Sequence, residues 1–261
     1  MTEIVTLLDA AHAAVAADPE NEVLRLRFFE RLADGEMVIL LEREATGDSL
    51  EPKIFDLEDG PVVLVFDREE RLASFSGGIA PYAALPGRVI AGLLRGQGIG
   101  MGVNLGVAPS SMLLPPEAMD WLAETLDEGP EEVEARPEEF LPPTVPEAVI
   151  AALDAKLARA GGLAVAALLA GVVYAGGRRG HLLALIDAAT GAEGALARAI
   201  NEALVFSGIE AGELDVVFLR EGDAAALAMA RVALRFDLPA PQTPLAPAAP
   251  GMDPARPPKL K

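Results

Sequence analysis

Residues 163–187 read LAVAALLAGVVYAGGRRGHLLALID, and this stretch decides the fold class. Two apolar runs, over 163–174 and 181–187, flank a short turn of glycine and arginine. Glycine-flanked apolar runs joined by a short turn favour two antiparallel strands. The alternative is a membrane-spanning helix, since 18 uncharged residues lie between Arg159 and Arg178. Because 11 of those 18 are glycine or alanine, we interpret the stretch as strand–turn–strand.

The segments around this hairpin alternate between helical and extended patterns. In the second half we expect helices at 146–160, 191–205 and 222–230, with strands at 214–219 and 231–236. In the first half we expect a helix capped by Thr2 that ends at Asp18, with His12 beside its apolar stripe, and a helix from Asn21 to Gly35. Strands at 37–41, 53–57 and 61–66 follow, and a tight hairpin turn at Glu58–Pro61 joins the last two. We then expect a short helix capped by Asp67 that runs through Leu72, a loop over 81–87 and a helix over 88–95. The pattern predicts an α+β protein with two small mixed α/β-type domains, each with a mainly antiparallel or mixed sheet flanked by helices.

An acidic, proline-containing segment predicts the domain boundary. Residues 127–145 hold seven acids and one base, whereas 1–126 form an N-terminal domain of net charge −12 and 146–236 a C-terminal domain of net charge −2. We expect 127–145 to be a linker without core residues, and 237–261 to be a disordered tail. Its prolines recur every third residue from Pro241, so the alternative is a polyproline ligand for an aromatic groove.

Composition excludes several classes of function. A net charge of −19 argues against a nucleic-acid partner, because such binding depends on Lys and Arg at phosphates. The acidity indicates solubility, and its alternative reading is a docking surface for a basic protein partner. Without cysteine, no disulfide or thiolate metal site can form. The start lacks a basic, apolar leader, so we expect a cytoplasmic protein that needs neither membrane, metal nor cofactor.

Two local patterns resemble catalytic or nucleotide-binding motifs but have the wrong context. The glycine run from Gly96 to Gly106 follows an expected helix and enters an extended segment, whereas a dinucleotide fingerprint leaves a strand and opens a helix. We expect its glycines to permit close backbone packing, with Ile99, Met101 and Val103 on the opposite side. Ser74 stands where a nucleophile elbow needs glycine, so a serine hydrolase is not expected.

The turn of the hairpin carries the sharpest candidate binding residues. Arg178, Arg179 and His181 lie within four positions on a glycine-rich turn, and together they could bind a carboxylate or phosphate. The alternative is a solvated turn with a histidine at the entry of the second strand.

The order of segments resembles the SseB family, named for enhanced serine sensitivity. Its N-terminal domain is matched by Asp18-Pro19, Phe29, Val62–Phe66 with Asp67, Arg71-Leu72, Tyr82, Leu85-Pro86-Gly87 and Gly102–Gly106. Its C-terminal domain is matched by Leu163–Tyr174, Gly176–His181, Leu182–Ile186, Ala195–Ser207 with Gly208 and Asp215–Leu219. This chain has Asn104-Leu105-Gly106 where the family tends to show Asn-Pro-Gly. The resemblance implies a bacterial family with no assigned reaction and no catalytic residues to carry over.

Two functions therefore stand as hypotheses. The first is a non-catalytic accessory protein that binds another protein, and the second is a small-molecule sensor or enzyme linked to serine or amino-acid metabolism. A pocket that joins Tyr82, Arg88 and Asn104, or Arg178, Arg179 and His181, would favour the second.

Overall fold

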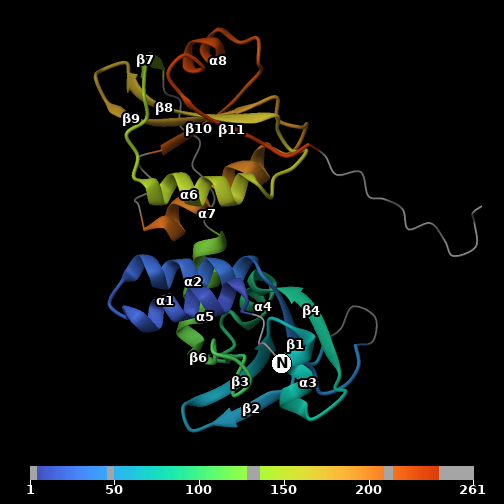
Figure 1. Ribbon diagram of the computed structural model, residues 1–261. Coiled ribbons are helices and arrows are strands. Elements are labelled where there is room, and N and C mark those ends of the chain that lie inside the picture. The colour runs from blue at the N-terminus through green and yellow to red at the C-terminus, as the bar shows by residue number, and fades with distance from the viewer. Residues whose placement is uncertain (1–4, 46–49, 128–135, 209–213, 241–261) are drawn as a thin grey trace, which may run out of the picture.

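Two mixed sheets with helices on both faces make up the protein. The computed structural model describes residues 5–45, 50–127, 136–208 and 214–240 (Figure 1). The first domain contains α1 (Leu7–Ala17), α2 (Glu22–Asp34), β1 (Glu36–Leu40), β2 (Ile54–Leu57), β3 (Gly60–Phe66), α3 (Glu69–Ser76), β4 (Tyr82–Pro86), α4 (Gly87–Leu94), β5 (Gly100–Val103), β6 (Met112–Leu114) and α5 (Pro116–Asp127). The second contains β7 (Pro137–Leu141), α6 (Glu147–Leu157), β8 (Ala166–Tyr174), β9 (Arg179–Ile186), α7 (Glu193–Ser207), β10 (Leu214–Leu219), α8 (Ala224–Met229) and β11 (Leu234–Asp237). The predicted α+β class with two mixed α/β domains is confirmed.

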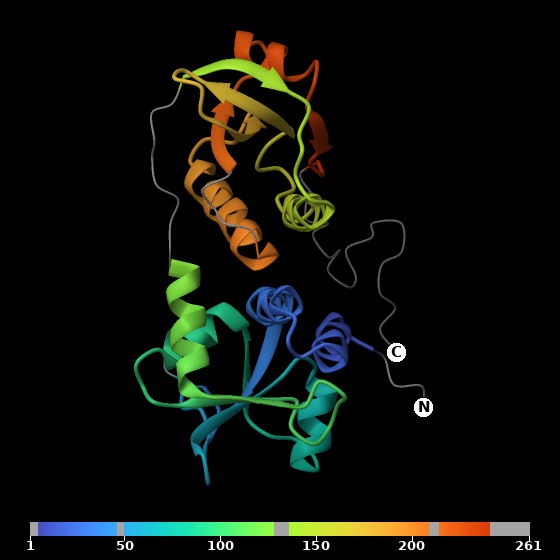
Figure 2. The same ribbon diagram turned by 90° about the vertical axis from the view of Figure 1, so that its left-hand side faces the viewer.

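The N-terminal sheet has the strand order β4-β1-β3-β5-β6, with β2 also paired to β3. Only β3 and β5 pair in parallel, so the sheet is mixed. Alternate side chains of β1 point to opposite faces of the sheet. Met37 and Ile39 join the larger core, beneath α1, α2, α4 and α5, whereas Val38 and Leu40 join the smaller core beneath α3. Helix α3 therefore lies alone on one face of this sheet (Figure 2).

The C-terminal sheet has the order β10-β9-β8-β11, and β7 pairs with the other half of β8. The hairpin predicted from 163–187 is β8 and β9, antiparallel from Ala166↔Ile186 to Val173↔Arg179. Leu169 and Leu183 face the core beneath α6 and α7, and Leu168 and Leu182 face the core beneath α8. Within the described residues, no helix is long and apolar enough to cross a membrane.

Three expectations about local structure are wrong, and each error has a physical reason. Residues 82–86, expected within the loop over 81–87, form β4. Its alanine-rich sequence has low strand propensity, and pairing with β1 stabilises the strand. Residues 137–141, expected within the linker, form β7, which pairs along β8 through its backbone while its acidic side chains remain exposed. Helix α3 has Arg68 rather than Asp67 at its N-cap position and runs on to Ser76, and Asp67 instead serves a buried network described below.

The caps of the first two helices explain where they begin. Thr6 caps α1, because its hydroxyl accepts the Asp9 N–H and the Asp9 carboxylate accepts the Thr6 N–H. Thr2, the expected cap, lies outside the described residues. Asn21 caps α2 as predicted, and Gly35 ends it. The tight turn expected at Glu58–Pro61 is also confirmed, and Gly60, at φ 117°, is the first residue of β3.

The glycine run packs as expected. Met101 and Val103 are fully buried in the larger N-terminal core, and Ile99 packs against it. A Cβ on Gly100 would lie 2.5 Å from the Leu114 carbonyl oxygen on β6. The expectation of close packing is thus confirmed at Gly100 and at Gly102, where a Cβ would lie 2.7 Å from the Leu64 side chain on β3. Gly96, Gly98 and Gly106 have no atom within 4 Å of a Cβ and instead adopt a positive φ, which glycine permits.

Candidate functional site

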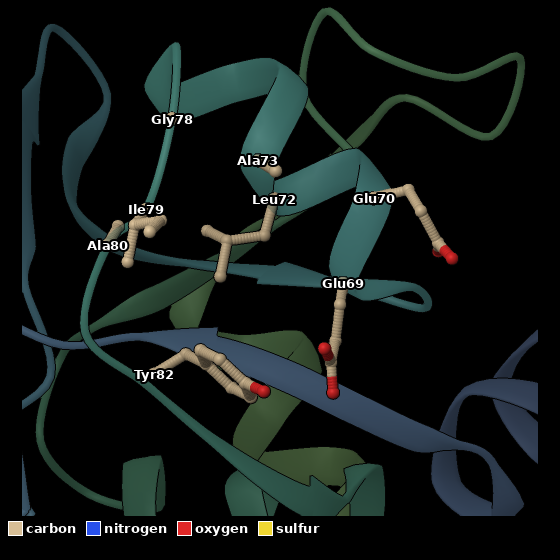
Figure 3. Close-up of a pocket in the computed structure, with 8 residues that line it drawn as sticks. All are labelled: Glu69, Glu70, Leu72, Ala73, Gly78, Ile79, Ala80 and Tyr82. Carbon is tan, nitrogen blue, oxygen red and sulfur yellow. The ribbon is translucent and has the colours of Figure 1, made fainter.

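An open apolar groove lies between α3 and β4 on the face of the N-terminal sheet that α3 leaves partly uncovered. We call this hollow the α3–β4 groove, and its volume is about 310 Å³. Eight residues line it (Figure 3): Glu69, Glu70, Leu72, Ala73, Gly78, Ile79, Ala80 and Tyr82. Leu72 is buried at its floor, whereas Ile79 is fully exposed and Tyr82 is 41% exposed. Uncovered apolar side chains beside a hollow are typical of a binding surface.

One carboxylate in the groove faces its only aromatic side chain. Figure 3 shows the Glu69 carboxylate directed toward the Tyr82 hydroxyl, whereas Glu70 points away. The Glu69 carboxylate, as a hydrogen-bond acceptor, raises the pKa of Tyr82. Glu70 is paired instead with Arg68, whose Nε lies 3.7 Å from its carboxylate. Glu69 is thus the acid that a ligand in the groove would meet.

The strand that borders the groove has a free edge. β4 pairs with β1 from Tyr82↔Leu40 to Pro86↔Glu36, and no other described strand pairs with it. The Leu41 N–H donates to Pro81 O and the Gly87 N–H donates to Gly35 O, both at 2.9 Å. In an antiparallel pair the bonded positions alternate, so the odd-numbered residues bond to β1. The N–H and C=O groups of Tyr82 and Ala84 therefore point outward.

A buried ion pair fixes α3, the helix that forms one wall of the groove. Arg71 on α3 donates Nη1 to Asp9 Oδ1 at 3.0 Å and Nη2 to Asp9 Oδ2 at 2.5 Å. Its Nη1 also donates to Asp67 Oδ1 at 2.7 Å, and all three side chains are more than nine-tenths buried. Since Asp9 belongs to α1, the guanidinium ties α3 to a helix on the other side of the sheet.

Asn104 completes this buried network from the loop after β5. Its Oδ1 accepts the Asp67 N–H at 3.2 Å, and its Nδ2 donates to Ser110 Oγ at 2.9 Å. Ser110 Oγ in turn donates to Asp9 Oδ1 at 2.5 Å, and Thr6 Oγ1 donates to Asp67 Oδ2 at 2.6 Å. Among the described residues, no buried side-chain nitrogen or oxygen lacks a partner. Asn104 is fully buried, so it is a structural member of this network and does not contact solvent.

The network lowers the pKa of Asp9 and so favours its charged form. Burial would raise the pKa of Asp9, but the hydrogen bonds from Arg71, Ser110 and the Thr6 N–H, with the charge of Arg71, hold it well below its usual range. An ionised carboxylate that accepts this many hydrogen bonds stabilises the fold only while it stays charged.

Arg88 lies in a different place, at the contact between the domains. Its Nη1 donates to Glu202 Oε1 on α7 at 3.0 Å, and its Nη2 donates to Asp34 Oδ1 on α2 at 2.5 Å. Lys156 on α6 joins the same acids, with Nζ 2.7 Å from Asp34 Oδ2 and 3.2 Å from Glu202 Oε2. Burial raises the pKa of Asp34, whereas Lys156 and Arg88 lower it. The second effect is larger, so the pKa of Asp34 lies below its usual value. We call these four side chains the interdomain ion cluster.

The predicted hairpin site is divided between the two faces of the C-terminal sheet, because Arg178 lies on one face and Arg179 and His181, two positions apart on β9, lie on the other. Arg178 stacks on Tyr174, 4.1 Å from the ring centroid, and donates to Asp215 Oδ2 at 2.9 Å. Tyr174 lies in the core beneath α8. His181 is two positions before Leu183 on β9, so it lies on the opposite face of the sheet, where Leu183 joins the core beneath α6 and α7. His181 Nε2 instead accepts the Thr144 N–H at 3.3 Å. Arg179 follows Arg178 at the first position of β9.

Comparison with known proteins identifies no relative. No protein-family model matches the chain, and neither curated proteins nor solved structures contain a match. The resemblance to the SseB family thus stays a prediction from the order of segments. No group of three or more metal-ligating side chains occurs in the described ranges.

Sequence reasoning named Tyr82 but missed the rest of the groove. Glu69 lay in the expected short helix, Ile79 lay between that helix and the expected loop over 81–87, and β4 was not expected as a strand at all. The signal that could have identified it is the pair of prolines, Pro81 and Pro86, that brackets a four-residue apolar run.

Proposed function

We propose that this chain is a non-catalytic accessory protein of the cytoplasm, and that it binds another protein through the α3–β4 groove. The observation that carries the proposal is the uncovered apolar groove beside a free strand edge. Strand edges of this kind are usually covered, charged or paired, because they recruit other chains. The resemblance to a family without an assigned reaction agrees with a role in binding rather than catalysis.

The placement of the candidate residues favours binding over catalysis. The sensor or enzyme hypothesis needs Tyr82, Arg88 and Asn104 to meet in one pocket. In the described part of the chain, Tyr82 lines the groove, Arg88 bridges the domains and Asn104 is buried without exposure to solvent. Arg178 and His181 likewise have separate partners. Neither predicted set of three residues is therefore gathered at one site in the described part of the chain.

The wall of the groove is held in place before any partner arrives. Because Arg71 anchors α3 to α1 through a buried bidentate ion pair, binding would cost little ordering of the helix. A preformed surface of this kind suits recognition of a protein segment.

Site-specific cross-linking in cells tests the proposal. A photoreactive benzoylphenylalanine replaces Ile79, and a matched variant carries it at Leu227, which is exposed on α8 in the other domain. After irradiation we expect a defined protein adduct at position 79 that is absent at position 227, identified by mass spectrometry. Equal adducts at both positions, or a small molecule alone at position 79, would contradict the proposal.

A further inference from the structure

We propose that the segment captured by the α3–β4 groove is an extended peptide that adds a strand to the edge of β4 and carries a lysine or arginine among alternating apolar side chains. This inference rests on the proposed function, since it specifies the partner of that same groove. Strand addition is a general mode of peptide recognition, in which backbone hydrogen bonds supply affinity and alternate side chains supply specificity.

The hydrogen-bonding groups of β4 define the length and register of the added strand. Tyr82 and Ala84 direct their N–H and C=O groups away from β1, and Pro86 contributes only a carbonyl. Pro81 and Pro86 lie at the two ends of the free stretch, so its length is about five residues. An incoming strand that paired here would therefore be short.

The side chains along β4 define the apolar character of the incoming strand. Tyr82, Ala84 and Pro86 lie on the α3 face, opposite Leu40, Val38 and Glu36, and all three are exposed. Every second side chain of an added strand would lie on this same face, beside Tyr82 and the exposed Ile79. Burying these apolar atoms would contribute favourable free energy in proportion to the covered area.

Two acids that form no ion pair define the charge of the incoming strand, and one of them, Glu69, already accepts the hydrogen bond of Tyr82. Glu69 lies at the Tyr82 end of β4, and Glu36 is the register partner of Pro86 at the other end. Neither carboxylate lies within 4.0 Å of a Lys, Arg or His nitrogen in the described ranges. The domain around them has a net charge of −12. A lysine or arginine on the incoming strand would thus meet a complementary charge at either end, whereas an acidic segment would be repelled.

The edge of β10 is longer than those of β6 and β11, the other strands at the ends of the two sheets, so it is the strongest competitor for strand addition among the described strands. It has six residues without proline, and β9 is its only partner among the described strands. Its side chains, however, pack into the cores beneath the helices on both faces, and Asp215 already binds Arg178. The β4 edge differs because it adjoins an open groove and two acids that form no ion pair within the described residues.

Selection from a displayed library of random nine-residue peptides tests the inference on the full chain. We expect the selected peptides to alternate apolar residues with Lys or Arg and to lack internal proline. Their affinity should fall at least about tenfold in Glu69→Lys, because a complementary charge becomes a repulsive one. Glu117→Lys is the matched control, since Glu117 is also an exposed acid in the first turn of a helix, and it should leave the affinity unchanged.

Backbone methylation separates strand addition from side-chain binding alone. Synthetic copies of the selected peptides, N-methylated at alternate residues, should lose binding in one of the two registers and keep it in the other. Equal binding of both registers, proline-rich or acidic selected sequences, or equal effects of Glu69→Lys and Glu117→Lys would overturn the inference. If position 79 still cross-links to a protein in that case, the proposed function stands and the inferred partner class is wrong.

Discussion

Arg71 is the cation that makes a buried arrangement of two carboxylates possible in the N-terminal domain. Asp9 and Asp67 both contact its guanidinium, and Ser110 and Thr6 donate the remaining hydrogen bonds. The sequence pointed to Asp67, Arg71 and Asn104 as members of a pattern, but not to their contact, because they are up to 37 positions apart. Asp9 was missed, since an acid near a helix start is usually explained by capping alone.

Replacing Arg71 with methionine should strongly destabilise the protein. Arg71→Met leaves two buried carboxylates without a cation, which typically costs about 3–5 kcal/mol of unfolding free energy. Arg68→Met is the control, because Arg68 makes only a partly exposed contact with Glu70 and its loss should cost about 0.5 kcal/mol or less. Urea unfolding measures both variants, and a similar small loss in each would show that the network does not stabilise α3.

The same network should make stability depend on pH. The folded-state pKa of Asp9 is below its ordinary value of 3.8, so its contribution is present above that value and is lost as the pH falls toward the folded-state pKa. Asp9→Asn should therefore be less stable than the wild type at pH 7, and the difference should shrink from about pH 4 downward. Urea unfolding at pH 7, 5, 4 and 3 checks this, and a constant difference across the series would contradict it.

Helix α4 shows at the element scale why two glycines of one helix have different roles. A Cβ on Gly87 would overlap the Leu32 carbonyl oxygen on α2, whereas a Cβ on Gly92 would meet no atom within 4 Å. Gly87 is thus required by the close approach of α2 and α4, and Gly92 only weakens the helix.

Alanine at the two positions should therefore have opposite effects. Gly87→Ala should lower the unfolding free energy by about 1–3 kcal/mol, because the backbone of α2 must move. Gly92→Ala should leave it unchanged or raise it by up to about 1 kcal/mol, since alanine favours the helix. Thermal unfolding compares them directly, and equal melting temperatures would show that α2 and α4 are not in close contact.

The sequence predicted elements well where apolar periodicity is strong and poorly where pairing alone makes the strand. The hairpin of β8 and β9 followed from two long apolar runs around glycines. β4 and β7 were missed because their residues, PYAALP around β4 and PEEFL in β7, have little strand propensity, so the neighbouring strand determines their conformation. The groove was missed for the same reason, since β4 forms one of its walls.

At the scale of the whole molecule, the helical layers of the two domains face each other (Figures 1 and 2). Phe206 of α7 is buried in the larger N-terminal core, beside Trp121 of α5 at 6.5 Å between ring centroids. The interdomain ion cluster lies at the same contact, where Lys156 of α6 pairs with Asp34 of α2 and with Glu202 of α7. The sequence could not predict this contact, because it depends on charged residues that pair across 122 positions.

Removing the lysine of this cluster should weaken the contact between the domains. Lys156→Met removes the buried ammonium that contacts Asp34, Glu202 and Glu30. Arg88 and Arg159 still bind Asp34, and Arg88 still binds Glu202, but the buried Glu30 carboxylate loses its ion pair. We expect a loss of about 3 kcal/mol in unfolding free energy. Lys53→Met removes an exposed lysine that lies 3.7 Å from Glu42, and it should cost about 0.5 kcal/mol or less. Losses of equal size in urea unfolding would mean that the cluster does not stabilise the contact.

Amide hydrogen exchange on the full chain tests the central claim most directly, because it reports where a bound segment forms hydrogen bonds. The protein is compared free and saturated with the partner that cross-links at position 79. We predict slower exchange at the outward amides of Tyr82 and Ala84, with no change along β10. Slower exchange along β10 with unchanged Tyr82 and Ala84 would contradict the claim that the edge of β4 is the binding surface.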